Sequence, residues 1–181
     1  NSSLWFGNRV MQFPLGIFAV AIATAILPTV AQQTSAKNLE AVKKTLSFGL
    51  RSIFLIVLPS ALGLIALREP IIRILFQHGQ FDAVSVARTA SVLMCYSVGL
   101  FAYSGQKIVV AGFYAAQDTR TPVKMAVAAL ISNIILNLAL MIPLKESGLA
   151  LATSISGILQ FVLLLIFYHR KIAAWDFRSL I

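Results

Sequence analysis

Arg9 is the first residue in the sequence whose type and position could support binding chemistry. It precedes a stretch from residue 10 to residue 36 that contains no charged side chain. A guanidinium that faces a water-filled cavity can hold a phosphate group through two parallel hydrogen bonds. A long cationic side chain at a helix end can also reach the lipid headgroups as an anchor. From the residues alone, the two interpretations are evenly balanced.

Gln12, Pro14 and Gly16 follow Arg9 closely. Gln12 lies three residues on and therefore on the same helical face, where its amide could share an anion with Arg9 or orient the guanidinium. Proline and glycine are poor helix formers, but proline is tolerated in the first turn of a helix. We therefore expect a helix that begins near residue 10, with Pro14 and Gly16 in its first turn.

Two further cations, Arg51 and Lys107, lie inside apolar segments rather than at their ends. Tyr96, Tyr103 and Gln106 precede Lys107 at helical spacing, so that the four side chains form one polar stripe. Because lipid-facing surfaces are apolar, the stripe predicts a face directed toward protein or a cavity. Lys107 and Arg51 lie near enough to a helix end to reach the headgroups, so both interpretations stay open for them.

Asn133 and Asn137 are four residues apart and share a helical face, and Thr153, Ser154 and Ser156 follow in the next apolar segment. Such side chains commonly join membrane helices through hydrogen bonds, which is the preferred interpretation. The alternative is a sodium site built from amide, hydroxyl and backbone oxygens. No carboxylate accompanies the group, which weakens that alternative.

Enzymatic chemistry has little support. The acidic residues all fall in loops or at the flanks of apolar segments: Glu40, Glu69, Asp82, Asp118, Glu146 and Asp176. His78 and His169 lie in different flanks, and no nucleophile with a nearby base or glycine-rich phosphate loop is present. We expect no enzyme and no bound cofactor, with coupling to Na⁺ or H⁺ left open.

Composition places these residues in a membrane protein. Of 181 residues, 59% are hydrophobic and 12% are charged, where a soluble domain carries about 25% charged residues. The single cysteine, Cys95, excludes a disulfide framework. The net charge is +9, but the cations stand at the ends of apolar runs. This pattern indicates membrane lipids or an anionic membrane substrate, and no nucleic acid.

Five segments have the roughly 20 mostly apolar residues that a spanning helix requires. They cover residues about 10–31, 46–67, 89–113, 122–143 and 147–169. Residues about 70–78 have apolar residues at helical spacing but are too short to span, which predicts an interfacial helix. The sequence therefore predicts an all-α integral membrane protein with five transmembrane helices and one short interfacial helix.

The loops differ in their number of cations. One side holds eight, namely Lys37, Lys43, Lys44, Arg120, Lys124, Arg170, Lys171 and Arg178. The other side holds five, namely Arg9, Arg68, Arg73, Arg88 and Lys145. By the positive-inside rule the first side is cytoplasmic, and we expect Arg9 near the outer face.

The chain contains three distinctive stretches, which begin at Asn8, Leu58 and Gly112. Together they resemble the MurJ/MviN lipid II flippase family. The first is NRVMQFPLGIFAVAIATAILP, which is similar to a family segment with an arginine, a proline, a glycine and an Ala/Thr-rich helix that ends in Leu-Pro. The second is LPSALGLIALREPIIRILFQHGQF. The third and most specific is GFYAAQDTRTPVK, which resembles a cytoplasmic loop of the family. The three lie in family order and at family spacing.

The resemblance implies the fold of the multidrug/oligosaccharidyl-lipid/polysaccharide exporters, in which fourteen helices include two lobes around a cationic cavity. Residues 1–181 would be a fragment that holds the eighth to the twelfth helix, most of the second, C-terminal lobe. The remaining helices of the full-length transporter would be its partners. The resemblance also implies a multi-pass protein of the bacterial cytoplasmic (inner) membrane.

Roles for single residues follow from the same resemblance. Arg9 matches a cavity arginine that is expected to contact the pyrophosphate or sugar of a lipid-linked precursor, with Arg51 and Lys107 adding positive potential. Some relatives carry an acid where Gln12 stands, so that an ion pair with Arg9 is lost here.

The resemblance extends to a possible ion site. Asn133, Asn137 and Thr153 fall where a sodium site has been placed in some members. There the position of Asn137 can be an aspartate, and its absence argues against sodium binding in this chain.

The function implied is the flipping of lipid II, a polyprenyl-pyrophosphate-linked disaccharide-peptide, for cell-wall synthesis. Two lobes that rock about the cavity would let the polar headgroup cross while the polyprenyl tail stays in lipid. The alternatives are a related exporter of other polyprenyl-linked glycans, a multidrug antiporter, or a membrane scaffold without transport activity.

Overall fold

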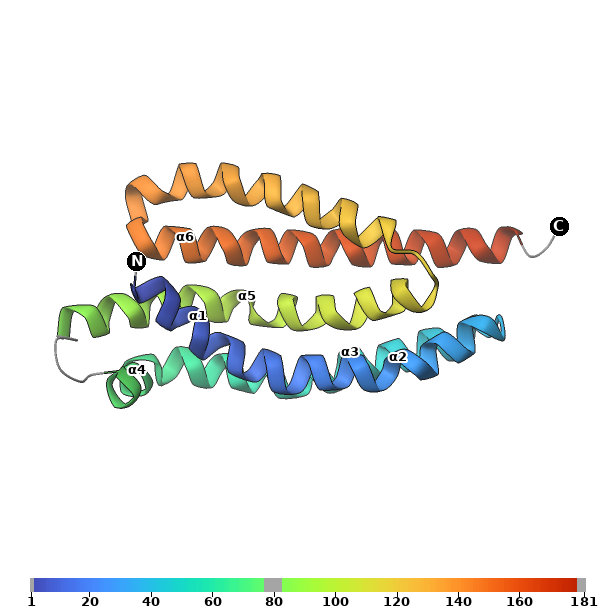
Figure 1. The fold of residues 1–181 in the computed structure, drawn as a ribbon, viewed down its shortest axis with the longest axis horizontal. Coiled ribbons are helices and arrows are strands. Elements are labelled where there is room, and N and C mark those ends of the chain that lie inside the picture. The colour runs from blue at the N-terminus through green and yellow to red at the C-terminus, as the bar shows by residue number, and fades with distance from the viewer. Residues whose placement is uncertain (1, 77–82, 179–181) are drawn as a thin grey trace.

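The computed structural model describes residues 2–76 and 83–178, and within these ranges the chain is almost entirely helical. Figure 1 shows long helices in three layers, with the two arms of α6 (Arg120–Arg178) on one side, α5 (Ala83–Ala115) in the middle, and α2 (Val20–Ser35) and α3 (Leu39–Ala66) on the other. Four described helices are long and apolar enough to cross a membrane, at residues 3–35, 39–66, 84–115 and 120–171. The chain is therefore a multi-pass membrane protein.

The first helical segment begins earlier than predicted. Helix α1 (Ser2–Pro14) continues through a π-helical segment, η1 (Leu15–Ala19), into α2. Pro14 ends α1 and does not lie in a first turn, so that prediction was wrong. The amide of Val20 donates to the carbonyl oxygen of Leu15, five residues earlier, and this wider turn absorbs the break that a proline imposes. Figure 1 shows the change of direction at this point.

Helix α3 also begins before its predicted start at residue 46. The side chain of Asn38 accepts a hydrogen bond from the amide of Ala41 at 3.1 Å and so caps the helix. Glu40 in the first turn complements the positive end of the helix dipole. A search for apolar runs does not include these polar residues, although they favour the start of a helix.

A short helix lies where the sequence predicts one, and the chain turns between the apolar segments predicted at about 122–143 and 147–169. Helix α4 (Arg68–Phe76) follows α3 directly, while residues 77 and 78 of the predicted helix lie outside the described residues. At Lys145 the backbone of α6 leaves the helical region, with φ 49° and ψ −125°. The two arms of α6 then run side by side (Figure 1). A Cβ atom at Gly148 would collide with the carbonyl oxygen of Leu140, so the turn requires glycine there.

Helix α5 holds the bundle together because it contacts the helices on both sides. Leu93, Leu100 and Ile108 on this helix are completely buried. Toward α6, a Cβ atom at Gly105 would lie 2.6 Å from the ring of Phe161, so the two helices approach closely. On the outer helices, by contrast, side chains such as Leu55 remain 76% exposed. Such apolar outer faces suit contact with lipid or further helices.

Candidate functional site

Arg9 lies in a pocket between α1 and α5. A Cβ atom at Gly7 would lie 2.9 Å from Cγ1 of Val92, so this glycine lets α1 pack tightly on α5. The pocket has a volume of about 450 Å³. Its lining consists of Leu4, Trp5, Asn8, Arg9, Gln12 and Tyr96. The structure therefore brings the two substrate-binding residues predicted on the first helix into one pocket.

The Arg9 guanidinium lies over the ring of Trp5. The central carbon of the guanidinium lies 5.0 Å from the centroid of the Trp5 ring, within the range of a cation–π interaction. The amide nitrogen of Gln12 donates to Oδ1 of Asn8 at 2.6 Å, and the predicted role of Gln12 beside Arg9 stays a prediction. Sequence reasoning missed Trp5. The spacing of four residues between an aromatic and a cation on one helix was the available signal.

Lys107 lines a second pocket farther along α5. This pocket has a volume of about 400 Å³ and lies among α2, α5 and α6, with polar groups from Thr24, Gln106 and Gln160. Lys107 follows Tyr96 by eleven residues, which corresponds to roughly 16 Å along the helix. Two cations thus border two pockets along the same face of α5.

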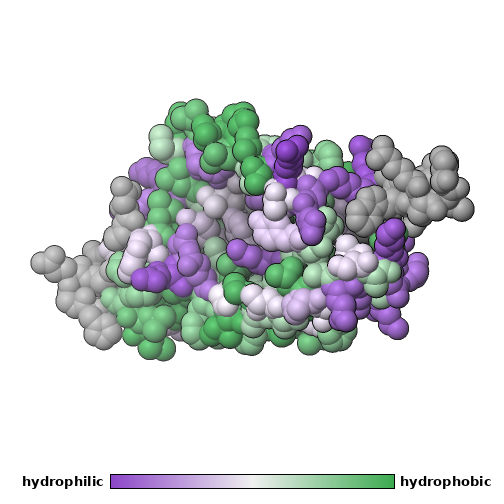
Figure 2. All heavy atoms as spheres, turned by 45° about the vertical axis from the view of Figure 1, so that its right-hand side comes forward, coloured by the Kyte–Doolittle hydropathy of each residue, from purple (hydrophilic) through white to green (hydrophobic). Residues whose placement is uncertain are grey.

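The rest of the predicted stripe on α5 contacts α6. The Tyr103 hydroxyl donates to the carbonyl oxygen of Thr153 at 2.6 Å, and the Gln106 amide donates to that of Gly157 at 2.7 Å. Three members of the stripe line pockets, namely Tyr96, Gln106 and Lys107. Figure 2 shows hydrophilic residues across the middle of one face, with hydrophobic residues above them.

Arg51 stands apart from these pockets. It lies on α3 with an exposed side chain and belongs to the lining of neither pocket. The described structure therefore does not bring it together with Arg9 or Lys107, and its role in substrate binding stays a prediction.

The predicted sodium-site residues do come together between the arms of α6. The Asn133 amide donates to the Ser156 hydroxyl at 3.0 Å and approaches that of Thr153 at 3.5 Å. The Asn137 amide donates to Oδ1 of Asn133 at 2.9 Å, while Oδ1 of Asn137 is buried without a partner. Most of these groups satisfy one another, as hydrogen bonds between membrane helices do.

Among residues 2–76 and 83–178, no group of three His, Cys, Asp or Glu side chains could hold a metal ion. Oδ1 of Asn137 is the one oxygen of the asparagine cluster that is buried without a partner in the described chain. The cluster thus fits a cation only in part, and sodium binding there stays a prediction.

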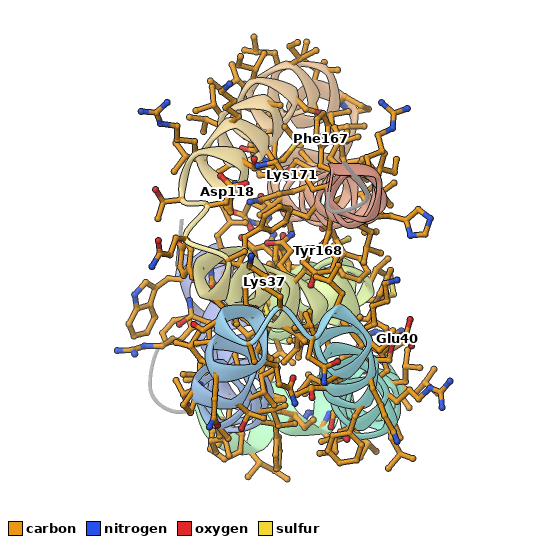
Figure 3. All side chains as sticks on the ribbon, turned by 90° about the vertical axis from the view of Figure 1, so that its right-hand side faces the viewer. Lys37, Glu40, Asp118, Phe167, Tyr168 and Lys171 are labelled. Atoms are coloured by element: carbon orange, nitrogen blue, oxygen red, sulfur yellow. The ribbon has the colours of Figure 1, made fainter. Side chains whose placement is uncertain are left out.

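An ion pair closes the opposite end of the bundle, where Figure 3 shows Asp118 and Lys171 side by side. Oδ1 of Asp118 also accepts a hydrogen bond from the amide of Thr121 at 3.1 Å and so caps α6. Partial burial opposes ionisation of Asp118, but the bonds from Lys171 and Thr121 outweigh it and lower its pKa to about 2. The pair ties the start of α6 to its end, and sequence reasoning did not predict it.

Comparison with known proteins gives consistent matches along the chain. The sequence model of a family described as "Lipid II flippase MurJ" matches residues 1–181. A probable lipid II flippase MurJ of Vibrio cholerae is 36% identical over 163 residues, which cover 90% of this chain and 31% of that protein. A probable lipid II flippase MurJ of Haemophilus influenzae is 39% identical, over 90% of this chain and 33% of that protein.

A solved structure agrees with these sequence matches. It is a lipid II flippase MurJ in an inward closed conformation, and it superposes with a TM-score of 0.84 at 32% identity. The match covers 96% of this chain and 38% of the solved chain. The chain thus spans about a third of the length of the curated relatives it matches.

Proposed function

The chain belongs to the lipid II flippase MurJ family, and we propose that it forms part of a transporter that flips lipid II across the bacterial cytoplasmic membrane. The observation that carries this proposal is the pocket of Arg9, Trp5, Asn8, Gln12 and Tyr96 between α1 and α5. A pocket with one fixed cation and several polar groups suits a polar headgroup with a phosphate.

In this proposal the chain crosses the membrane five times. The turn at Lys145 divides α6 into arms of residues 120–144 and 146–171. Each arm has about 25 residues and a length of roughly 37 Å, enough to cross a hydrocarbon core of about 30 Å. Helix α4 would lie at the interface. Together these elements would form most of the second lobe of a longer transporter, whose other helices would be its partners.

The proposed orientation follows from the distribution of cations. Lys37 and Lys171 lie at the same end of the bundle, as Figure 3 shows, and this end carries the larger number of positive side chains. The positive-inside rule assigns that end to the cytoplasm. Helix α1, which holds Arg9, lies toward the other end, where the two arms of α6 meet in Figure 1, and Arg9 would face the outer side.

The proposed mechanism is alternating access between two lobes. Arg9 binds the diphosphate of the headgroup, and Lys107 raises the positive potential farther along the same face of α5. Arg51 would contribute when other helices complete the cavity. The polyprenyl tail stays in lipid, so only the headgroup needs a polar path. The membrane potential or a cation gradient would drive the cycle, with the asparagine cluster as a weaker candidate for sodium coupling.

Labelling of position 9 with a water-soluble thiol reagent tests this proposal. The experiment uses the full-length transporter with its native cysteines replaced, including Cys95→Ala, and with the substitution Arg9→Cys. We expect rapid labelling, because the Arg9 side chain is exposed to the pocket. Protection is measured with Leu4→Cys, which lines the same pocket and keeps Arg9 in place, and lipid II should slow the labelling of that cysteine.

The outcomes separate the candidate functions. A scaffold without a cavity would leave position 9 unlabelled. Equal protection by lipid II and by other polyprenyl-linked glycans would favour a related exporter, and protection by drug-like cations alone would favour a multidrug antiporter.

A further inference from the structure

We propose that Trp5 is a stacking platform for a sugar ring of the substrate, directly beside the diphosphate that Arg9 binds. This inference rests on the proposed function, because it divides the headgroup of a glycosyl diphosphate between two neighbouring side chains. Arg9 takes the charged part, and Trp5 takes the uncharged ring next to it.

The Trp5 ring is held in place and yet accessible. Its side chain is 56% exposed, although an indole of this size is usually well buried. The Phe6 ring lies 5.0 Å away at 81°, and Phe6 in turn packs on Phe76 of α4 with ring centroids 4.4 Å apart. A chain of aromatic contacts thus runs from α4 to the indole. A rigid and exposed aromatic surface beside a cation suits ligand contact at a low entropic cost.

The polar side chains that surround Arg9 in the pocket are better suited to bind the hydroxyl groups of a sugar than a phosphate group. Arg9 is the single charged residue of the lining, which also holds Asn8, Gln12 and Tyr96. The side-chain amides of Asn8 and Gln12 form a hydrogen bond of 2.6 Å, and Tyr96 lies beside Asn8. Amide and phenol groups both donate and accept hydrogen bonds, as ring hydroxyls do. A bare diphosphate, in contrast, would be met best by several cations.

The geometry of a pyranose fits this division of groups. One face of such a ring presents C–H groups that stack on an aromatic surface, while its hydroxyls point outward to polar side chains. A sugar on Trp5 would therefore have its first phosphate near the guanidinium, which lies 5.0 Å from the same indole. The pocket combines the two chemistries within one turn of α1.

The test compares two ligands on the full-length transporter. One is a polyprenyl diphosphate that carries the disaccharide, and the other is the same polyprenyl diphosphate without sugar. We expect Trp5→Ala to weaken binding of the sugar-bearing lipid by roughly fivefold and to change binding of the sugar-free lipid by less than about twofold. Trp5→Phe keeps an aromatic face and should retain most of the affinity. Trp5→Leu keeps an apolar side chain without such a face and should behave like Trp5→Ala.

Arg9→Ala distinguishes this inference from the proposed function, because it should weaken the binding of both ligands. If Arg9→Ala affects neither ligand, the proposed function fails, whatever Trp5 does. If Arg9→Ala weakens both and Trp5→Ala also weakens both equally, Trp5 only positions Arg9 and the sugar platform is refuted. An unchanged affinity in Trp5→Leu for the sugar-bearing lipid would refute it as well.

Discussion

Gly99 is the position where a single added methyl group should separate α5 from α6. A Cβ atom there would lie 2.8 Å from Oγ and 2.9 Å from both Cα and Cβ of Ser154. Real Cβ atoms essentially never approach another heavy atom closer than 3.0 Å. Because Cα of Ser154 belongs to the backbone, a rotamer change cannot relieve the contact, and the two helices must move apart in Gly99→Ala.

The energetic cost can be worked out from this geometry. Separation of the helices by several tenths of an ångström overpacks a buried contact, which costs about 1–3 kcal/mol. It also stretches the hydrogen bond from the Ser154 hydroxyl to the carbonyl oxygen of Cys95, now 2.7 Å long, and such a bond in a membrane protein contributes about 0.6 kcal/mol. The higher helix propensity of alanine returns up to about 1 kcal/mol. We expect a net loss of about 1–2 kcal/mol in the free energy of unfolding.

Thermal or denaturant-induced unfolding in detergent micelles measures this loss. Gly63→Ala is the matched control, because Gly63 lies inside α3 and a Cβ atom there would meet nothing within 4 Å. The control should unfold at the same midpoint as the unchanged protein or at a slightly higher one. Equal stability of Gly99→Ala and Gly63→Ala would refute the close approach of α5 and α6 that the account of the bundle requires.

Three further predictions concern the polar contacts of α6. Because the pKa of Asp118 is lowered to about 2 from an ordinary value of about 4, its pairing with Lys171 stabilises the fold fully above pH ~4 and is lost as the pH falls toward 2. Asp118→Asn should therefore cost about 1 kcal/mol at neutral pH and remove that acid dependence in pH-resolved unfolding. Glu40→Gln, at an exposed pair with a 3.9 Å separation, should cost only about 0.3 kcal/mol and leave the acid dependence of Asp118 in place. Asn133→Ala should lower the free energy of unfolding by about 1 kcal/mol, because it removes the centre of the asparagine network. Asn137→Asp supplies a carboxylate and should raise the unfolding midpoint in NaCl above that in KCl, and equal midpoints in the two salts would exclude a sodium site even in that variant.

The sequence was sufficient to predict an all-helical membrane protein, because runs of about 20 apolar residues have few other structures in a membrane. It also predicted the short helix α4, and it separated the two arms of α6 as the apolar segments at about 122–143 and 147–169. The helix starts were missed at α1 and α3, where polar residues and aromatic residues such as Trp5 extend each helix beyond its apolar part. A search for apolar runs finds the part of a helix that crosses the hydrocarbon core, but it does not find the polar residues that cap the helix.

The sequence indicated cations of the candidate site, but it did not predict how the side chains around them are arranged. Arg9 and Lys107 were found because a cation in an apolar segment is conspicuous, and both line pockets. Sequence periodicity places residues on a helical face but does not say which neighbour each one contacts. The pairing of Asp118 with Lys171 joins residues that are 53 positions apart, and only the packing of α5 against α6 creates it.

The central claim is that the Arg9 pocket binds the headgroup of lipid II during translocation. The most direct measurement is the rate at which the full-length transporter carries lipid II across a membrane, compared between the unchanged protein, Arg9→Ala and Arg73→Ala. Arg73 is the matched control, because it is an exposed cation on α4 that lines neither pocket. A charge-assisted hydrogen bond contributes about 1.5–3 kcal/mol, so Arg9→Ala should slow translocation by roughly tenfold or more, while Arg73→Ala leaves it unchanged. Translocation at the full rate in Arg9→Ala would contradict the account.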